Sequence, residues 1–366
     1  MAIMGVSSIT PAFPKMIDAF RISPQQIGLL ITLFTLPGIF LTPMLGVLAD
    51  QWGRKRILVP SLFLFGIAGA ACTLIQNFHV LLLFRLFQGI GGAALGSLNV
   101  TIIGDLYDGR DRSAAMGYNA SVLSVGTASY PVIGGAMALF GWYFPFLLPL
   151  LAIPVGLGVL FGLRNPEPKL QQHLRTYLKQ AWQSIANIQV IGLFVASIVT
   201  FIILYGSYLT YLPLLIDTRF GGSSLIIGVI MSSMSFTTAI TSSQLGNLTT
   251  RFREQTLLKV SFVFYTLALI IMPFVSHIWL LLIPTVLFGI GHGLNIPNIQ
   301  TLLAGWAPMD QRAIIMSLNG MVLRTGQTLG PITIGAMYAF WGINGAFLAG
   351  AGFAAAMFLG VVLMIK

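Results

Sequence analysis

The stretch of sequence that decides the fold occurs twice, 200 residues apart. Residues 112–137 read RSAAMGYNASVLSVGTASYPVIGGAM, and residues 312–337 read RAIIMSLNGMVLRTGQTLGPITIGAM. Without a gap they share Arg112/Arg312, Met116/Met316, Asn119/Asn319, Gly126/Gly326, Pro131/Pro331 and Gly135/Gly335. Shared leucines would be expected by chance in an apolar chain, whereas coinciding Arg, Asn, Pro and Gly indicate a duplication. The sequence therefore predicts two homologous halves.

The composition shows which surroundings this chain can tolerate. Of its 366 residues, 56% are hydrophobic and 8% are charged, and the mean hydropathy is +0.89. A soluble globular protein carries about a quarter charged residues. Together with the single cysteine, Cys72, this excludes a soluble enzyme, a secreted disulfide scaffold and a disordered chain. The solvent that accepts such a surface is a lipid bilayer.

The lengths of the apolar runs predict the membrane spans, because a spanning helix needs about 20 mostly apolar residues. Charged or Pro/Gly-rich breaks leave eleven full spans, at residues 26–49, 57–76, 80–104, 113–140, 143–163, 188–214, 225–248, 257–275, 278–304, 313–340 and 342–364. Residues 1–17 precede them and are apolar but too short to cross.

The duplication predicts that this first helix is incomplete. In the second copy, about 17 apolar residues, Ile188–Leu204, precede the segment Tyr205-Gly206-Ser207, which matches Met4-Gly5-Val6-Ser7 of the first copy. We therefore expect the first helix to lack its cytoplasmic half, with the true start upstream of the assigned one.

The predicted fold class is an all-α integral membrane protein of twelve transmembrane helices, arranged as two homologous six-helix halves. The halves are expected at residues 1–163 and 188–366, joined by a polar cytoplasmic linker at 164–187. Two parallel six-helix halves are typical of secondary transporters, whose binding site lies between the halves near the middle of the membrane.

The basic residues predict the orientation. Fourteen Lys and Arg residues fall on the side of the linker and the last residue, three on the other side, and two, Arg85 and Arg324, within spans. By the positive-inside rule the basic side is cytoplasmic. The protein is thus expected to be a multi-pass protein of the cell (inner or plasma) membrane, with its linker and C-terminus in the cytoplasm. The net charge of +10 is a topology signal, and no nucleic-acid partner is expected.

The loop after the first full span reads Gly46-Val-Leu-Ala-Asp50-Gln-Trp-Gly53-Arg54-Lys55-Arg56. It resembles the G-x-L-x-D-x-x-G-R-[KR]-x loop of the major facilitator superfamily. The resemblance implies a charge cluster, completed by Asp105, that latches the two halves in the outward-facing state. The alternative is ordinary anchoring by positive charge. The second half has GNLTTRFRE at residues 246–254, without the acid and the second glycine, so the first loop is the expected regulator.

The span at residues 80–104 contains Arg85-Leu-Phe-Gln88-Gly89, which resembles the R-x-x-Q-G motif of the same family. A single helical stripe is formed by Arg85, Gln88, Gly92, Gly96 and Asn99. An arginine in the membrane costs at least ~2.5 kcal/mol unless it faces water or a partner. The stripe is therefore predicted to face the central cavity.

The span at residues 113–140 has Gly117, Gly126, Pro131, Gly134 and Gly135 in the order G-x8-G-x3-Y-P-x2-G-G. This is similar to the G-x8-G-x3-G-P-x2-G-G pattern of the 12-helix drug:proton antiporters, with Tyr130 in place of one glycine. The second half repeats the proline region as Gly326, Gly330 and Pro331, with Ile334 opposite Gly134. Small residues allow close helix packing and proline bends a helix, so these segments are predicted to act as pivots.

Candidate cavity residues were sought among the embedded polar groups, because all nine acids fall at span ends or in loops. The set predicted to meet substrate or proton is Arg85, Gln88, Asn99, Asn119, Tyr208, His292, Asn295, Arg324 and Gln327. His292 has a reference pKa of about 6.5. It, or an acid of the missing part of the first helix, is the hypothetical proton carrier, and Arg85 or Arg324 would repel the proton or hold an anionic group. Alternatively, His292 only hydrogen-bonds across two helices.

The resemblance to the superfamily covers essentially the whole chain and implies a monomeric transporter that works by alternating access. The favoured function is proton-coupled efflux of drugs or other small molecules, with the small-molecule substrate, protons and lipid as partners. The alternative is a carrier of an anionic metabolite or a sugar-like solute. No His/Cys cluster has metal-ligand spacing, and no nucleophile–base pair or phosphate loop is present, so no cofactor, metal or enzymatic activity is expected.

Overall fold

The computed structural model describes residues 3–163, 188–306 and 312–365, and this part of the chain is helical without a strand. The predicted linker at residues 164–187 lies outside the described residues. Ten helices in the described part are long and apolar enough to cross a membrane. The last of them, Ile315–Met364, breaks at Gly342, whose φ of 64° lies in the left-handed region that favours glycine. Counting its two arms separately, the eleven predicted spans are confirmed.

The first half begins with four short elements and continues with longer helices. Its elements are α1 (Met4–Ser7), η1 (Thr10–Ala12), α2 (Phe13–Phe20), α3 (Pro24–Ile27), α4 (Leu29–Trp52), α5 (Arg54–Ala71), η2 (Cys72–Leu74), α6 (Phe78–Leu106), α7 (Gly109–Phe140), η3 (Phe144–Leu151) and α8 (Ala152–Gly162). Local sequence sets several starts: Ser23 and Gln26 form a capping box at α3, and the Asn77 side chain accepts hydrogen bonds from the first turn of α6.

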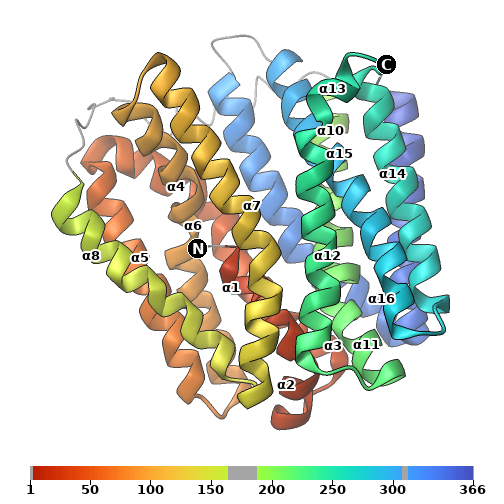
Figure 1. The fold of residues 1–366 in the computed structure, drawn as a ribbon. Coiled ribbons are helices and arrows are strands. Elements are labelled where there is room, and N and C mark those ends of the chain that lie inside the picture. Colours follow the sequence, from red (N-terminus) through yellow and green to blue (C-terminus); the bar gives the residue numbers. More distant parts are fainter. Residues whose placement is uncertain (1–2, 164–187, 307–311, 366) are drawn as a thin grey trace.

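The second half repeats this order from residue 188. Its elements are α10 (Ile188–Ile202), η4 (Ile203–Tyr211), α11 (Leu212–Phe220), α12 (Ser224–Ser243), α13 (Leu245–Thr249), α14 (Glu254–Ile271), η5 (Met272–Phe274), η6 (Ile278–Leu281), α15 (Leu282–Trp306) and α16 (Arg312–Met364). The segment η4 is a π-helical stretch within one continuous span, and it packs against α16. In Figure 1 the long helices of the first half lie to the left of those of the second half.

The two halves meet along two pairs of helices, α7 with α12 and α4 with α16. The backbones of α7 and α12 approach so closely that a Cβ on Gly228 would overlap the carbonyl oxygen of Pro131. In the other pair, a Cβ on Gly28 would lie 2.7 Å from Cβ of Pro331. Gly28 and Gly228, like Pro131 and Pro331, are 200 residues apart, so the two contacts are copies of each other. The duplication read from the sequence is thus also a pseudo-twofold relation in space.

These contacts lie toward one end of the bundle. We call the end that carries Arg54–Arg56 and Arg251–Arg253 the basic end, at the top of Figure 1, and the opposite end the outer end. The contacts at Gly28, Pro131 and Gly228 lie in the outer parts of their helices. The bundle is therefore closed between the halves toward its outer end.

Toward the basic end, polar side chains of both halves are exposed. Asn99 and Ser121 are exposed on α6 and α7, and Gln300 and Thr301 are exposed on α15. An open hollow of about 500 Å³ on the surface of α15 is lined by Pro297, Gln300, Thr301, Ala304 and Gly305. Exposed polar groups in helices of this hydropathy face water rather than lipid. We call the space that they line the vestibule, and it opens at the basic end.

Candidate functional site

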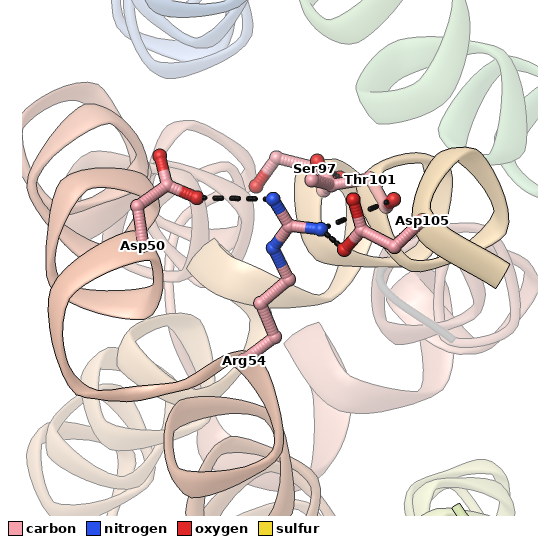
Figure 2. A network of polar contacts seen from close by, with 5 residues as sticks. All are labelled: Asp50, Arg54, Ser97, Thr101 and Asp105. Carbon is pink, nitrogen blue, oxygen red and sulfur yellow. Dashed lines mark hydrogen bonds and ion pairs between the residues drawn. The ribbon is translucent and has the colours of Figure 1, made fainter. Parts of the chain in front are cut away.

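A cluster of charged side chains lies at the basic end of the first half (Figure 2). Arg54, the first residue of α5, is buried and forms ion pairs with Asp50, at 3.3 Å, and with Asp105 of α6. Its Nη1 also donates to the carbonyl oxygen of Thr101 at 3.4 Å. The turn between α4 and α5 is made by Gly53, whose φ of 105° few other residues adopt. This turn places Arg54 against the carboxylate that ends α4.

The partners of Arg54 just named all belong to the first half. Of the other residues in the loop motif, Lys55 donates to the carbonyl oxygen of Leu163 at 3.1 Å, Arg56 is exposed, and a Cβ on Gly46 would meet nothing within 4 Å. The cluster thus joins α4, α5 and α6. The predicted latch would hold the two halves together in the outward-facing conformation. This structure has the opposite conformation, so the latch stays a prediction.

The predicted cavity stripe on α6 is divided between two environments. Arg85 is fully buried, where its Nε donates to the carbonyl oxygen of Leu30 at 3.0 Å and its Nη1 donates to Oε1 of Gln88 at 2.5 Å. Its guanidinium also lies 4.4 Å from the ring centre of Phe34. The prediction that Arg85 and Gln88 line the cavity is wrong for this structure, because both side chains are fully buried. The guanidinium of Arg85 contacts the Leu30 carbonyl, the Gln88 amide and the Phe34 ring instead of water. Only the end of the stripe near Asn99 is exposed.

Two predicted cavity residues of the second half are also buried. The Asn295 side chain accepts from Thr200 at 3.0 Å and donates to Ser261 at 2.9 Å, which fastens α15 to α10 and α14. The Tyr208 hydroxyl donates to the carbonyl oxygen of Met231 at 3.1 Å. Neither side chain lines the vestibule in this conformation. Thr200 and Ser261 were not predicted as partners of Asn295, because they stand in apolar runs where a hydroxyl has no visible partner in the sequence.

His292 and Asn119 occupy intermediate positions. The Nδ1 of His292 lies 2.7 Å from the Tyr265 hydroxyl, and the His292 side chain is partly exposed. This hydrogen bond joins α15 to α14. It agrees with the alternative role of His292, in which the side chain only hydrogen-bonds across two helices. Asn119 is partly exposed and its Oδ1 accepts from Nδ2 of Asn99 at 2.6 Å, so these two predicted residues do meet, at the vestibule.

The proline end of the predicted pivot motif packs tightly, whereas its other end is open. Added Cβ atoms on Gly134 and Gly135 would overlap the carbonyl oxygens of Ser8 and Ser224. For a Cβ on Gly126 the three nearest atoms all belong to Tyr130 of the same helix, and a Cβ on Gly117 would meet nothing within 4 Å.

In the second half, the corresponding glycines serve contacts within that half. An added Cβ on Gly326 would lie 2.6 Å from the carbonyl oxygen of Ile198, and one on Gly330 would lie 3.0 Å from that of Ile202. Close packing is therefore present at most of the motif, and its action as a pivot stays a prediction.

Arg324 lies between the two halves. A Cβ on Gly38 of α4 would be 3.0 Å from Cδ of Arg324, so the arginine side chain crosses the backbone of the other half. One turn further toward the outer end, the hydroxyls of Thr35 and Thr328 are 2.9 Å apart, and Thr32 donates to the carbonyl oxygen of Thr328 at 3.1 Å. These threonines were not predicted, because their only signal in the sequence is a hydroxyl within an apolar helix.

The burial of these side chains predicts a labelling pattern. In a variant with Cys72 replaced by alanine, Asn99→Cys is expected to react about tenfold faster than Asn295→Cys with a maleimide that cannot cross membranes, because an exposed thiol is reactive and a buried one is inert. Inside-out vesicles present the basic end to the reagent if that end is cytoplasmic. Equal rates at the two positions would contradict the vestibule described above.

A duplicated bundle of membrane-spanning helices, with a polar vestibule between its halves, defines the class of α-helical membrane transporters. The family model of the Major Facilitator Superfamily matches residues 1–225 and 215–366. The chain belongs to the major facilitator superfamily, and it is a multi-pass membrane transporter and not an enzyme.

Curated relatives and solved structures resemble the chain over most of its length. It is 26% identical to the bacillibactin exporter of Bacillus subtilis (strain 168), over 91% of the chain and 86% of the relative. It is 24% identical to the class B tetracycline resistance protein of Escherichia coli, over 92% of the chain and 85% of that relative.

Two crystal structures show the same fold. A bacterial homologue of the human lysosomal transporter Spinster, inward-facing and unoccupied, matches with a TM-score of 0.80 at 19% identity, over 99% of this chain and 93% of the other. The nucleoside transporter NupG matches with a TM-score of 0.80 at 15% identity, over 100% of this chain and 98% of the other.

Proposed function

We propose that this transporter is a proton-coupled exporter of drugs or other small organic molecules, which works by alternating access. The observation that carries the proposal is the asymmetry of the bundle, closed between the halves toward the outer end and open at the basic end. With the basic end cytoplasmic, this is the inward-facing state of an alternating-access cycle, in which an exporter would take up a molecule from inside the cell. The relatives named as exporters and resistance proteins support the direction.

In this proposal the two halves rock about the contacts at the outer end, and substrate and proton stabilise opposite-facing states by their different affinities for them. The membrane potential contributes about 2.3 kcal/mol per charge per 100 mV. The proton is carried by His292, which is partly exposed in α15 and held by Tyr265, whereas the carboxylates of the described residues lie near helix ends.

A growth-inhibition panel in an efflux-deficient bacterium tests the exporter. Expression is expected to raise the inhibitory concentration of a subset of compounds, and the protonophore CCCP is expected to remove the difference in accumulation. Cells with an empty vector are the control. Protection that persists unchanged with CCCP would contradict proton coupling, and increased sensitivity to transported compounds would indicate import.

The role of His292 is tested with the compounds that the panel identifies. His292→Asn is expected to remove the pH dependence that the histidine confers on transport, because an amide does not titrate. Tyr265→Phe removes the hydrogen bond and keeps the imidazole, so it is expected to retain a pH dependence. An unchanged pH profile in His292→Asn assigns the histidine to structure alone.

The second candidate function is a carrier of an anionic metabolite, and the position of Arg324 between the halves favours it. In the panel, this candidate predicts no protection against cationic compounds. It also predicts that uptake of an organic anion into vesicles depends on the protein but not on the proton gradient.

A further inference from the structure

We propose that Arg324 binds an anionic group of the transported molecule, so that the substrates of this protein include small organic anions. The inference rests on the proposed function to the extent that the vestibule is the route of transport. It adds the charge of the substrate and the residue that recognises it.

Arg324 lies between the two halves, on the basic side of the contact that closes the outer end. It follows Arg312 by 12 residues along α16, which is about 18 Å and hence near the middle of a bilayer core. Toward the outer end, the contact of Thr35 with Thr328 seals the two halves. Toward the basic end, Gly320 lies one turn away, and a Cβ there would meet nothing within 4 Å.

Among the described residues, no carboxylate balances the Arg324 charge, and the group that interacts with it electrostatically is the neutral hydroxyl of Tyr205. In this part of the chain no oxygen accepts a hydrogen bond from the Arg324 guanidinium, and the side chain is partly exposed. Arg85 provides the contrast within the same chain, since its Nε and Nη1 donate to a carbonyl and an amide oxygen and a ring packs on its guanidinium, which leaves only Nη2 without a partner. An embedded cation without a balancing charge is costly, and a bound anion removes that cost.

The surroundings of Arg324 specify what kind of anion fits. The guanidinium offers a planar fork of donors that matches a carboxylate. Gln327, one turn further along α16, has a buried Oε1 without a hydrogen-bond partner, which can accept from a donor on the same molecule. The backbone of Gly38 leaves space for the arginine stem, since a Cβ there would come within 3.1 Å of Nε. A carboxylate with a neighbouring hydroxyl or amine therefore fits the site.

Two measurements on one reporter cysteine test this inference. In the Cys72→Ala background, Gly320→Cys is labelled with an anionic and a cationic methanethiosulfonate, MTSES and MTSET. At about 6 Å a unit charge changes each rate roughly threefold in a water-like medium, so Arg324→Gln is expected to lower the MTSES/MTSET ratio about tenfold. Gly117→Cys, which also faces open space but on α7, is the matched control, whose ratio is expected to stay constant.

The second measurement uses salicylate and its uncharged analogue salicylamide. Salicylate is expected to slow the labelling of Gly320→Cys by the neutral reagent MMTS, salicylamide is expected to have a much smaller effect, and Arg324→Gln is expected to abolish the protection. Gly38→Ala, which displaces the guanidinium, is expected to weaken the protection. Any of three outcomes overturns the inference: the MTSES/MTSET ratio does not depend on Arg324, salicylate and salicylamide protect equally, or salicylate does not protect.

Failure of this inference can be told apart from failure of the proposed function. If compounds without an acidic group are exported equally by the wild type and by Arg324→Gln, and salicylate does not protect, the exporter stands and the anion site is absent. If the panel shows no export but labelling and protection follow Arg324, the anion site stands and the exporter is wrong.

Discussion

Replacing Gly135 or Gly228 by valine is expected to hold the two halves apart at the outer end and to reduce transport about a hundredfold. A Cβ at Gly135 would overlap the carbonyl oxygen of Ser224, and one at Gly228 would overlap that of Pro131. Overpacking of this kind costs roughly 3 kcal/mol, which changes the ratio of two conformations about 150-fold. Because the overlapping atoms belong to the other half, separating the halves relieves the strain without unfolding either one.

The change of conformation can be measured separately from the loss of transport. Cysteine at Thr32, buried at the outer closure, is expected to become reactive toward a reagent from the outer side in Gly228→Val, while labelling of Gln300→Cys in the vestibule decreases. Gly117→Val, in open space on α7, is the control for α7 and keeps wild-type transport. Gly134→Val should instead impair folding, because its overlap with Ser8 lies within one half. Normal transport by Gly135→Val would show that this closure is not part of the cycle.

Replacing Arg54 by alanine is expected to destabilise the protein by about 3–5 kcal/mol, because breaking a buried ion pair leaves charge without compensation. Two carboxylates lose their partner: the Asp105 side chain is 16% exposed and that of Asp50 is 35% exposed. The measurement is the thermal unfolding midpoint of the purified protein in detergent, together with the folded yield from membranes.

Arg56→Ala is the matched control, because Arg56 lies on the same helix and is exposed. It is expected to leave the unfolding midpoint unchanged within error. Asp105→Asn should lower the midpoint more than Asp50→Asn, since the less exposed carboxylate depends more on its cationic partner. If Arg54→Ala and Arg56→Ala behave alike, the cluster contributes nothing to the stability of the first half, and anchoring by positive charge explains the motif.

The number and position of the spans were predictable from sequence because they depend on local properties. The length of an apolar run decides whether a helix crosses the bilayer, and a glycine such as Gly342 or Gly53 at a break permits the reversal. The cluster at Arg54 was also predictable, since Asp50 is four residues away and Asp105 ends a neighbouring span. The repeat of residues 112–137 at 312–337 predicted the twofold arrangement.

The environment of each embedded polar residue was not predictable in the same way. Arg85 and Arg324 both stand in apolar helices, and helical periodicity assigns each to a face without saying what packs against that face. The carbonyl that holds Arg85 belongs to Leu30, 55 residues earlier, and the backbone beside Arg324 belongs to Gly38 of the other half. The amino-acid order alone thus determines the spans, their duplication and the charged loop. Which arginine is enclosed by protein and which one stays open to a ligand depends on groups that only the packing of distant helices brings together.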